Sequence, residues 1–166
     1  MKIFTLFFVL FSSHAYSHVI RQYPDAPLRI ITVGHPTLGL QAKEVNFEEI
    51  ATGEFQAFAD DMISTMKEAG GVGLAAPQVN VSKRMFVMKP SSFKRAEVII
   101  NPFVKYLESK GTKSSREGCL SIPGKTFKVK RYKQIQVSYI DRHGEHHSEK
   151  AKGFRAIVFQ HEYDHL

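Results

Sequence analysis

The sequence contains no tryptophan and only one cysteine among its 166 residues. A single cysteine cannot form an intramolecular disulfide, so the fold does not depend on disulfide bonds. The most apolar run, residues 3–11, is too short to cross a membrane, which takes about 20 residues. Acidic residues are outnumbered, with 16 Asp and Glu against 23 Lys and Arg. The excess of base favours anionic neighbours but identifies neither a fold nor a reaction.

What remains is an ordinary globular composition, with 43% hydrophobic and 23% charged residues. Such fractions exclude a disordered chain, a collagen-like repeat and a coiled coil, and the length fits one domain. The N-terminus differs, because Lys2 precedes the apolar run and small residues follow it. This pattern is typical of a secretory signal peptide, and a buried N-terminal strand is the alternative. We predict a signal peptide over residues 1–17 and a single domain over residues 18–166.

Hydrophobic spacing predicts two helices. Apolar residues recur at helical spacing over residues 47–68, where Asn46 and Glu49 resemble a capping box and Gly70 and Gly71 end the helix. A second helix, at the C-terminal end, is indicated by five residues that share one stripe: Phe154, Ile157, Val158, His161 and His165.

Short strand-like runs lie between these helices. They cover residues 84–88, 97–100, 126–129 and 134–140, and the last run alternates apolar and polar residues. Residues 141–144 suit the tip of a hairpin. The predicted fold class is α+β, with a central helix packed against mostly antiparallel sheets.

The C-terminal helix carries the pattern H-E-x-x-H at residues 161–165. Two histidines four residues apart share a helix face and can bind one metal ion, while Glu162 between them can act on a metal-bound water. Two surface histidines are the alternative reading. Because only Leu166 follows, a third ligand must come from upstream, and Cys119 is the single cysteine. A thiolate and two imidazoles with an open fourth position form a catalytic site, although a lone cysteine can also be an inert buried residue.

A third segment, residues 71–78, is rich in glycine and alanine and ends at Gln78. It lacks the glycine and lysine spacing of a phosphate-binding loop. Its small residues permit close approach of a ligand or another segment, and the Gln78 amide can donate to a developing oxyanion. Taken alone, the segment also fits a tight structural turn.

Together the three segments resemble, in order, the motifs of the peptide deformylase family. These motifs are G-x-G-x-A-A-x-Q at residues 71–78, E-G-C-L-S at residues 117–121 and Q-H-E-x-D-H-L at residues 160–166. The resemblance covers about residues 27–166. It departs from the family at Asn80, where glycine is usual, and the family normally continues beyond the last motif. We therefore expect a domain that is short at its C-terminal end.

The resemblance implies the family's α+β fold and hydrolysis of the N-formyl group from an N-terminal formyl-methionine, with release of formate. The metal ligands would be Cys119, His161 and His165. Fe(II) is the family's usual metal and Zn, Ni or Co can substitute, whereas ligand chemistry alone favours Zn. Glu162 would accept a proton from the metal-bound water and pass it to the leaving amine.

Further site predictions concern the substrate. Two donors would stabilise the charge that grows on the formyl oxygen, namely the side chain of Gln78 and the backbone N–H of Leu120. Three residues of the C-terminal helix would form a slot for the methionine side chain, or simply pack in the core: Phe154, Ile157 and Val158. Three others would pair with the substrate backbone like an added strand: Val72, Gly73 and Gly118.

The basic residues of one strand and loop form a patch that consists of Lys125, Lys128, Lys130, Arg131 and Lys133. Such a patch is either a solvated face or a contact with ribosomal RNA or a membrane. No nucleic-acid motif supports DNA binding, and we expect a monomer.

Localisation and activity each leave alternatives. The N-terminus predicts export to the periplasm or the medium, whereas deformylation normally occurs in the cytoplasm or an organelle. Besides a deformylase, the H-E-x-x-H pattern allows a broader metallopeptidase or a non-catalytic relative that binds metal or peptide. The upstream Cys119 and Gln78 argue against a broader metallopeptidase. The intact metal and acid–base residues argue against a non-catalytic relative.

Overall fold

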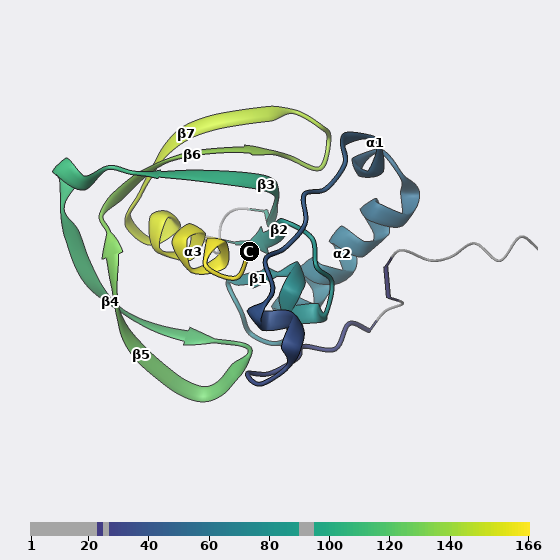
Figure 1. Ribbon diagram of the computed structural model, residues 1–166, viewed down its shortest axis with the longest axis horizontal. Coiled ribbons are helices and arrows are strands. Elements are labelled where there is room, and N and C mark those ends of the chain that lie inside the picture. Colours follow the sequence, from purple (N-terminus) through teal and green to yellow (C-terminus); the bar gives the residue numbers. More distant parts are fainter. Residues whose placement is uncertain (1–22, 25–26, 90–94) are drawn as a thin grey trace, which may run out of the picture.

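The computed structural model describes residues 23–24, 27–89 and 95–166 (Figure 1). The predicted signal peptide lies outside these residues. The helices are α1 (Phe47–Ile50), α2 (Gly53–Glu68) and α3 (Gly153–Tyr163), with short 3-10 helices at Pro36–Gly39, Ala76–Val79 and Glu108–Lys110. The strands are β1 (Gly73–Ala75), β2 (Met85–Met88), β3 (Glu97–Tyr106), β4 (Thr112–Cys119), β5 (Ile122–Tyr132), β6 (Gln134–Ile140) and β7 (His146–Lys152). Within the described ranges, no helix is long and apolar enough to span a membrane.

The strands form two sheets. One has five strands in the order β1-β2-β3-β6-β7, and the other is the two-stranded ribbon β4-β5. Every pair within these sheets is antiparallel, which confirms the predicted α+β class. Helix α3 lies between the two sheets and contacts strands of both (Figure 1). The helix with the H-E-x-x-H pattern is therefore central to the fold, as predicted.

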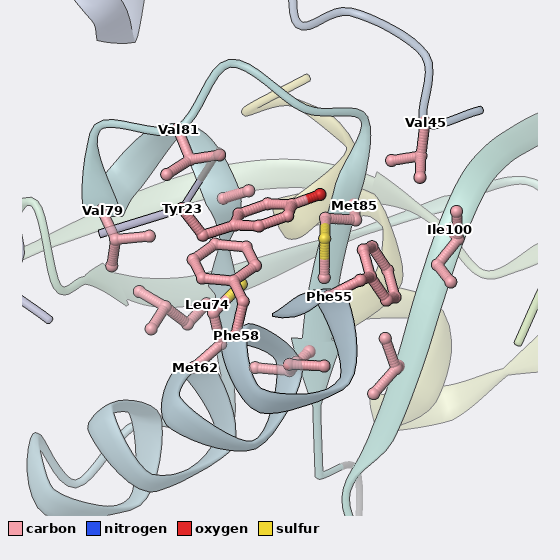
Figure 2. Close-up of a cluster of buried hydrophobic side chains, with 14 of the residues drawn as sticks. Tyr23, Val45, Phe55, Phe58, Met62, Leu74, Val79, Val81, Met85 and Ile100 are labelled. Atoms are coloured by element: carbon pink, nitrogen blue, oxygen red, sulfur yellow. The ribbon is translucent and has the colours of Figure 1, made fainter. Parts of the chain in front are cut away.

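Strand β2 separates two hydrophobic clusters, because its side chains alternate between the two faces of the sheet. Met85 and Val87 pack in the cluster under α2, whereas Phe86 and Met88 pack in the cluster under α3. In the first cluster, Tyr23 stacks on Phe58 with ring centroids 4.3 Å apart (Figure 2). The five-stranded sheet is thus covered by α2 on one face and by α3 on the other.

The predicted helix over residues 47–68 is wrong in one respect, because it is two helices. Helix α1 ends at Ile50, and Thr52 caps α2 by accepting a hydrogen bond from the Phe55 N–H. The predicted capping box forms only by half. The Glu49 carboxylate accepts from the Asn46 backbone N–H, while the Asn46 side chain makes no cap bond. Threonine favours a cap position and glycine is unfavourable inside a helix. The chain therefore ends one helix before Thr52 and begins a second at Gly53.

The strand predictions hold best where alternation was clear. Residues 134–140 form β6 with Ile135, Val137 and Tyr139 buried, and residues 141–144 form the turn to β7. Strand β3 runs further than the predicted residues 97–100, because a register shift after Ile100 accommodates Asn101, whose φ is 48°. The Asn101 side chain bonds both the N–H and the C=O of Val45, so the irregularity is fixed by hydrogen bonds.

Candidate metal centre

Three potential ligands meet between the end of β4 and the end of α3. The donor atoms of Cys119, His161 and His165 all lie within 4.8 Å of one another. The Cys119 Sγ to His165 Nε2 distance is 3.4 Å. A tetrahedral ion with usual metal–sulfur and metal–nitrogen bonds would hold such atoms about 3.6 Å apart. The donor set and its spacing therefore fit one metal ion.

Cys119 is positioned by a tight turn. It ends β4 opposite Ile122, the first residue of β5, and the register shifts between Gly118 and Cys119. Burial raises the pKa of the thiol, while backbone N–H groups of Ser121 and Ile122 donate toward it and partly offset that rise. Since a bound cation favours a thiolate strongly, these donors are suited to a ligating sulfur.

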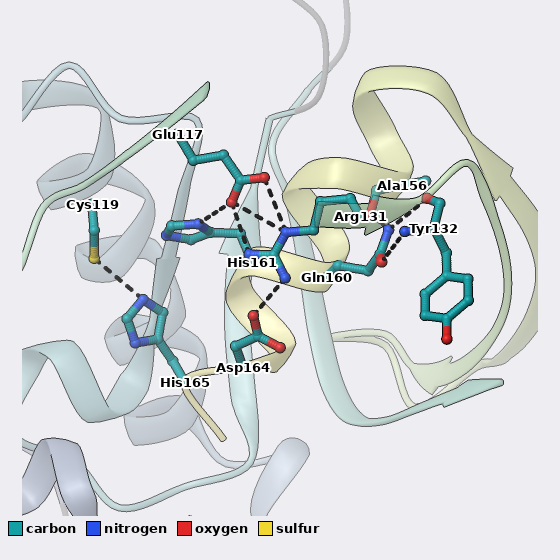
Figure 3. Close-up of polar contacts among 9 residues, drawn as sticks. All are labelled: Glu117, Cys119, Arg131, Tyr132, Ala156, Gln160, His161, Asp164 and His165. Carbon is teal, nitrogen blue, oxygen red and sulfur yellow. Dashed lines mark hydrogen bonds and ion pairs between the residues drawn. The ribbon is translucent and has the colours of Figure 1, made fainter. Parts of the chain in front are cut away.

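The His161 ring is oriented by a charge network in which Glu117 and Arg131 are buried and Asp164 is exposed (Figure 3). Its Nδ1 lies 2.9 Å from Glu117 Oε2, which leaves Nε2 for a metal. Arg131 donates to the same carboxylate through Nε and Nη2, and its Nη1 donates to Asp164 at 2.5 Å. Burial raises the pKa of Glu117, but the hydrogen bonds from Arg131 and His161 outweigh it and hold that pKa below its usual value. Glu117 is therefore an anion that accepts from the imidazole.

This network corrects the predicted basic patch. Arg131 is only 7% exposed and is paired with Glu117 and Asp164, so it does not belong to a solvated surface. The strand alternation explains the difference, because Arg131 faces α3 while Lys130 on the same strand faces solvent. The patch consists of the four exposed lysines alone: Lys125, Lys128, Lys130 and Lys133.

Helix α3 is fixed against β5 by Gln160. Its Oε1 accepts from the Tyr132 N–H, and its Nε2 donates to the carbonyls of Tyr132 and Ala156 (Figure 3).

His165 lies just beyond the end of α3, where its N–H donates to the Glu162 carbonyl. Burial lowers the pKa of His165 to about 4, so the ring is neutral and keeps a lone pair for a metal.

Glu162 points into the same pocket with an unusual environment. The residue is 4% exposed, and within the described part of the chain its Oε2 has no hydrogen-bond partner. Burial raises the pKa of this carboxyl to about 8. A Cβ at Gly73 would lie 2.1 Å from Glu162 Oε1, so the absence of a side chain at Gly73 makes room for the carboxyl. A buried carboxyl left without a partner is a candidate for proton transfer.

The amide of Gln78 has a defined orientation. Its Oε1 accepts from the Ala75 N–H at 2.8 Å, so its Nε2 is directed toward Cys119 Sγ, 3.5 Å away, and Ser121 Oγ, 3.1 Å away. The predicted tight turn is a short strand, β1, followed by a 3-10 helix that carries Gln78. The amide N–H groups therefore face the space beside the ligands, where a donor was predicted.

A pocket of about 710 Å³ opens beside the ligands. Cys119 and His161 line it together with Glu162, Gln78 and Leu120. All six residues predicted to contact substrate also line it: Val72, Gly73, Gly118, Phe154, Ile157 and Val158. Phe154 is 52% exposed at the rim and Val158 is 4% exposed, so the helical stripe is not one uniformly buried face.

Sequence reasoning missed three supporting residues, namely Glu117, Arg131 and Ser121. Glu117 was detectable, because it precedes Cys119 by two positions in a strand and so shares its face. A ligating histidine usually needs such a carboxylate. Asp164 accepts from Arg131, which donates to Glu117, and Glu117 in turn contacts His161.

The chain is similar to known proteins in both sequence and fold. A family model described as polypeptide deformylase matches residues 27–166. The chain is 45% identical over 138 residues to a peptide deformylase of Fusobacterium nucleatum, covering 83% of this chain and 78% of that protein. A crystal structure of peptide deformylase from Thermotoga maritima superposes with a TM-score of 0.77 at 39% identity, covering 84% of this chain and 90% of that chain. A Met-Ala-Ser-bound class I type b peptide deformylase from Acinetobacter baumannii superposes with a TM-score of 0.78 at 33% identity, covering 84% and 92%. The chain belongs to the peptide deformylase family.

Proposed function

We propose that the pocket beside Cys119, His161 and His165 is where this chain hydrolyses the N-formyl group of N-terminal formyl-methionine in peptides and nascent proteins. As a member of the peptide deformylase family, the chain is a hydrolase that removes this group and releases formate. One observation carries the assignment of the site. A metal-binding donor set, an unpartnered buried carboxyl and an oriented amide converge on a single pocket.

Cys119, His161 and His165 would hold one divalent metal ion. When bound, this ion would supply a Lewis acid that makes water a nucleophile near neutral pH. The donor set suits Fe(II), Zn, Ni or Co. We propose Fe(II), on the basis of the motifs shared with the family, and metal analysis of protein purified without oxygen tests that choice.

Glu162 would take the proton of the attacking water on its carboxylate and deliver it to the departing amine nitrogen. Burial supports this role, because it raises the pKa of Glu162 to about 8 and so keeps the carboxyl a competent acid as well as a base. No other acid of the described pocket is available, since Glu117 is engaged by Arg131 and His161.

Gln78 and Leu120 would stabilise the charge that develops on the formyl oxygen. The bond from Ala75 holds the amide with Nε2 toward Cys119, and Leu120 follows Cys119 at the pocket wall. Because the donors are held before substrate arrives, they need no rearrangement during the reaction. Loss of one donor, as in Gln78→Leu, is expected to lower kcat on the order of 100-fold.

Substrate contacts would divide between side chain and backbone. Phe154, Ile157 and Val158 would receive the methionine side chain along α3. The segment Val72–Gly73 and Gly118 would pair with the peptide backbone, since both lie at strand ends that border the pocket. The small formyl carbon would fit where a larger acyl group would not.

Formate release from formyl-Met-Ala-Ser by anaerobically Fe(II)-loaded protein tests the assignment. Acetyl-Met-Ala-Ser and an internal-peptide substrate serve as controls, and both should remain intact. Removing the metal with a chelator should abolish release, and Cys119→Ala should bind metal more weakly. Cleavage of internal peptides would favour the metallopeptidase alternative. Full activity of Cys119→Ala with its metal retained would overturn the ligand assignment.

Two further predictions concern partners. We propose a monomer, which sedimentation analysis of the purified protein tests. A ribosome contact through Lys125, Lys128, Lys130 and Lys133 stays a prediction. If it exists, cosedimentation with ribosomes should fall steeply as salt is raised and should weaken when these lysines are replaced.

A further inference from the structure

The rim of the pocket is positively charged. Arg116 on β4 and Lys125 on β5 both line the pocket and are exposed to solvent. Among the residues that the structure describes, neither takes part in an ion pair, and Arg116 donates only to the Thr126 hydroxyl, at 3.3 Å. The rim therefore presents two uncompensated cations to anything that enters.

This charge is unfavourable for the ribbon itself. Arg116 lies directly opposite Lys128 in the β4-β5 pairing, and like charges at such positions destabilise a sheet. The only acid in either strand is Glu117, which is buried and already bonded to Arg131 and His161. Since nothing within the ribbon offsets the repulsion, an external anion would relieve it.

The position of Arg116 indicates which part of a substrate it meets. The formyl group would lie beside Cys119, and a peptide extended along β4 would place its first residue near Gly118. Successive residues of a strand advance by about 3.3 Å, so the third residue would lie beside Arg116, three positions before Cys119. Lys125 lies across the ribbon, next to Thr126, which is paired with Gly118.

We propose that Arg116 and Lys125 select formyl peptides that carry a carboxylate at the third residue. The inference rests on the proposed function of the pocket. The carboxylate has two possible sources, namely an acidic side chain in a longer chain or the free C-terminus of a formyl tripeptide. In both cases Arg116 lies beside the carboxylate, while Lys125 adds positive charge along the same rim. The charge strengthens binding and speeds encounter, and both effects weaken with salt.

The experiment compares kcat/KM for matched peptides on metal-loaded protein at low salt. Formyl-Met-Ala-Asp-amide, its Asn counterpart and its Lys counterpart test the side chain. Formyl-Met-Ala-Ser as free acid and as amide tests the C-terminus. We expect Asp over Asn and acid over amide by about 5-fold each, as two exposed cations would give, with Lys disfavoured. Both preferences should shrink in 0.5 M salt.

Variants assign the effect to the rim. The double variant Arg116→Gln/Lys125→Gln should lose the preference for Asp over Asn, and Arg116→Glu/Lys125→Glu should favour the Lys peptide. Lys150→Gln removes one exposed charge from β7, outside the pocket, and should keep the preference. Equal kcat/KM for Asp, Asn and Lys peptides would overturn the inference while leaving the deformylase assignment intact. Failure to release formate from every peptide would instead overturn the proposed site.

Discussion

Two regions of the molecule each contain a buried glutamate, and the two carboxyls differ in their hydrogen bonding. Away from the pocket, Glu49 accepts hydrogen bonds from Lys83 at 2.7 Å and from the Tyr23 hydroxyl. In the metal centre, Glu162 is also buried, but within the described chain its Oε2 has no partner. The pKa of Glu49 is lowered, because its hydrogen bonds outweigh the effect of burial, whereas burial raises that of Glu162 to about 8.

Hydrogen bonding distinguishes carboxyls that support the structure from carboxyls that can transfer a proton, and burial alone does not. Glu117 lies in the metal centre yet resembles Glu49, since a cation and further donors hold it as an anion. Its carboxylate contacts the Nδ1 of His161 at 2.9 Å. A buried acid that is fully bonded stabilises the fold or orients a neighbour, while an unsatisfied one is free to exchange a proton.

The largest expected effect comes from replacing each glutamate by its amide. Glu162→Gln should lower kcat on the order of 1,000-fold, because the proton acceptor is lost, while stability is kept. Glu49→Gln should leave kcat unchanged and lower stability, because it weakens the bond to Lys83. Formate release and urea unfolding of both variants measure the contrast. Metal content must be equal in each sample, and comparable activity in the two variants would break the distinction.

A second test moves the Glu162 carboxyl without removing it. In Gly73→Ala the new Cβ would lie 2.1 Å from Glu162 Oε1, so the carboxyl must shift. A shift of this size should lower kcat about 100-fold. Gly53→Ala is the matched control, because its Cβ would meet nothing within 4 Å. Wild-type kcat in Gly73→Ala would show that the carboxyl position is not critical.

A third pair of variants removes the cation from each paired glutamate. Arg131→Met should lower the unfolding free energy by about 3 kcal/mol, because Glu117 is left as a buried charge. Lys83→Met should lower it by about 2 kcal/mol through Glu49. Only Arg131→Met should also weaken metal binding, by about 10-fold or more, since Glu117 orients His161. Equal metal affinity in both variants would show that Glu117 does not contribute to metal binding.

The sequence predicted which residues lie together at the site better than it predicted the residues that hold them in place. The H-E-x-x-H spacing on a helix predicts adjacent imidazoles, and the structure brings them to Cys119, which lies 42 positions before His161. That pairing depends on long-range strand order, which periodicity does not contain. The single cysteine and the lack of a ligand after His165 indicated Cys119, and the motifs shared with the family agreed with that prediction. Arg131 was assigned to a surface patch because lysines surround it, and only the register of β5 reveals that it faces α3.

Local competition explains the other errors. Residues 47–68 have helical periodicity throughout, but periodicity does not register that Thr52 can cap a new helix. Strand β3 continues past Asn101 because the side chain of that residue bonds Val45, which lies 56 positions away. Alternation was sufficient to predict β6. Its residues alternate between buried and partly exposed along the strand, and β6 pairs with β3 on one side and β7 on the other.

The smallest expected effect is the pH dependence contributed by Glu49. Burial raises its pKa, but hydrogen bonds from Lys83 and Tyr23 outweigh this, so the pKa in the folded chain lies below its usual value. A carboxyl with a lowered pKa stabilises the fold fully at pH values above its unfolded pKa. This stabilisation is lost as the pH falls through the folded pKa. The difference in unfolding free energy between wild type and Glu49→Gln should therefore be about 1 kcal/mol at pH 6 and should shrink below pH 4. Urea unfolding of metal-free protein across this range measures it, and a difference that grows on acidification would mean that the carboxylate is not the stabilising form.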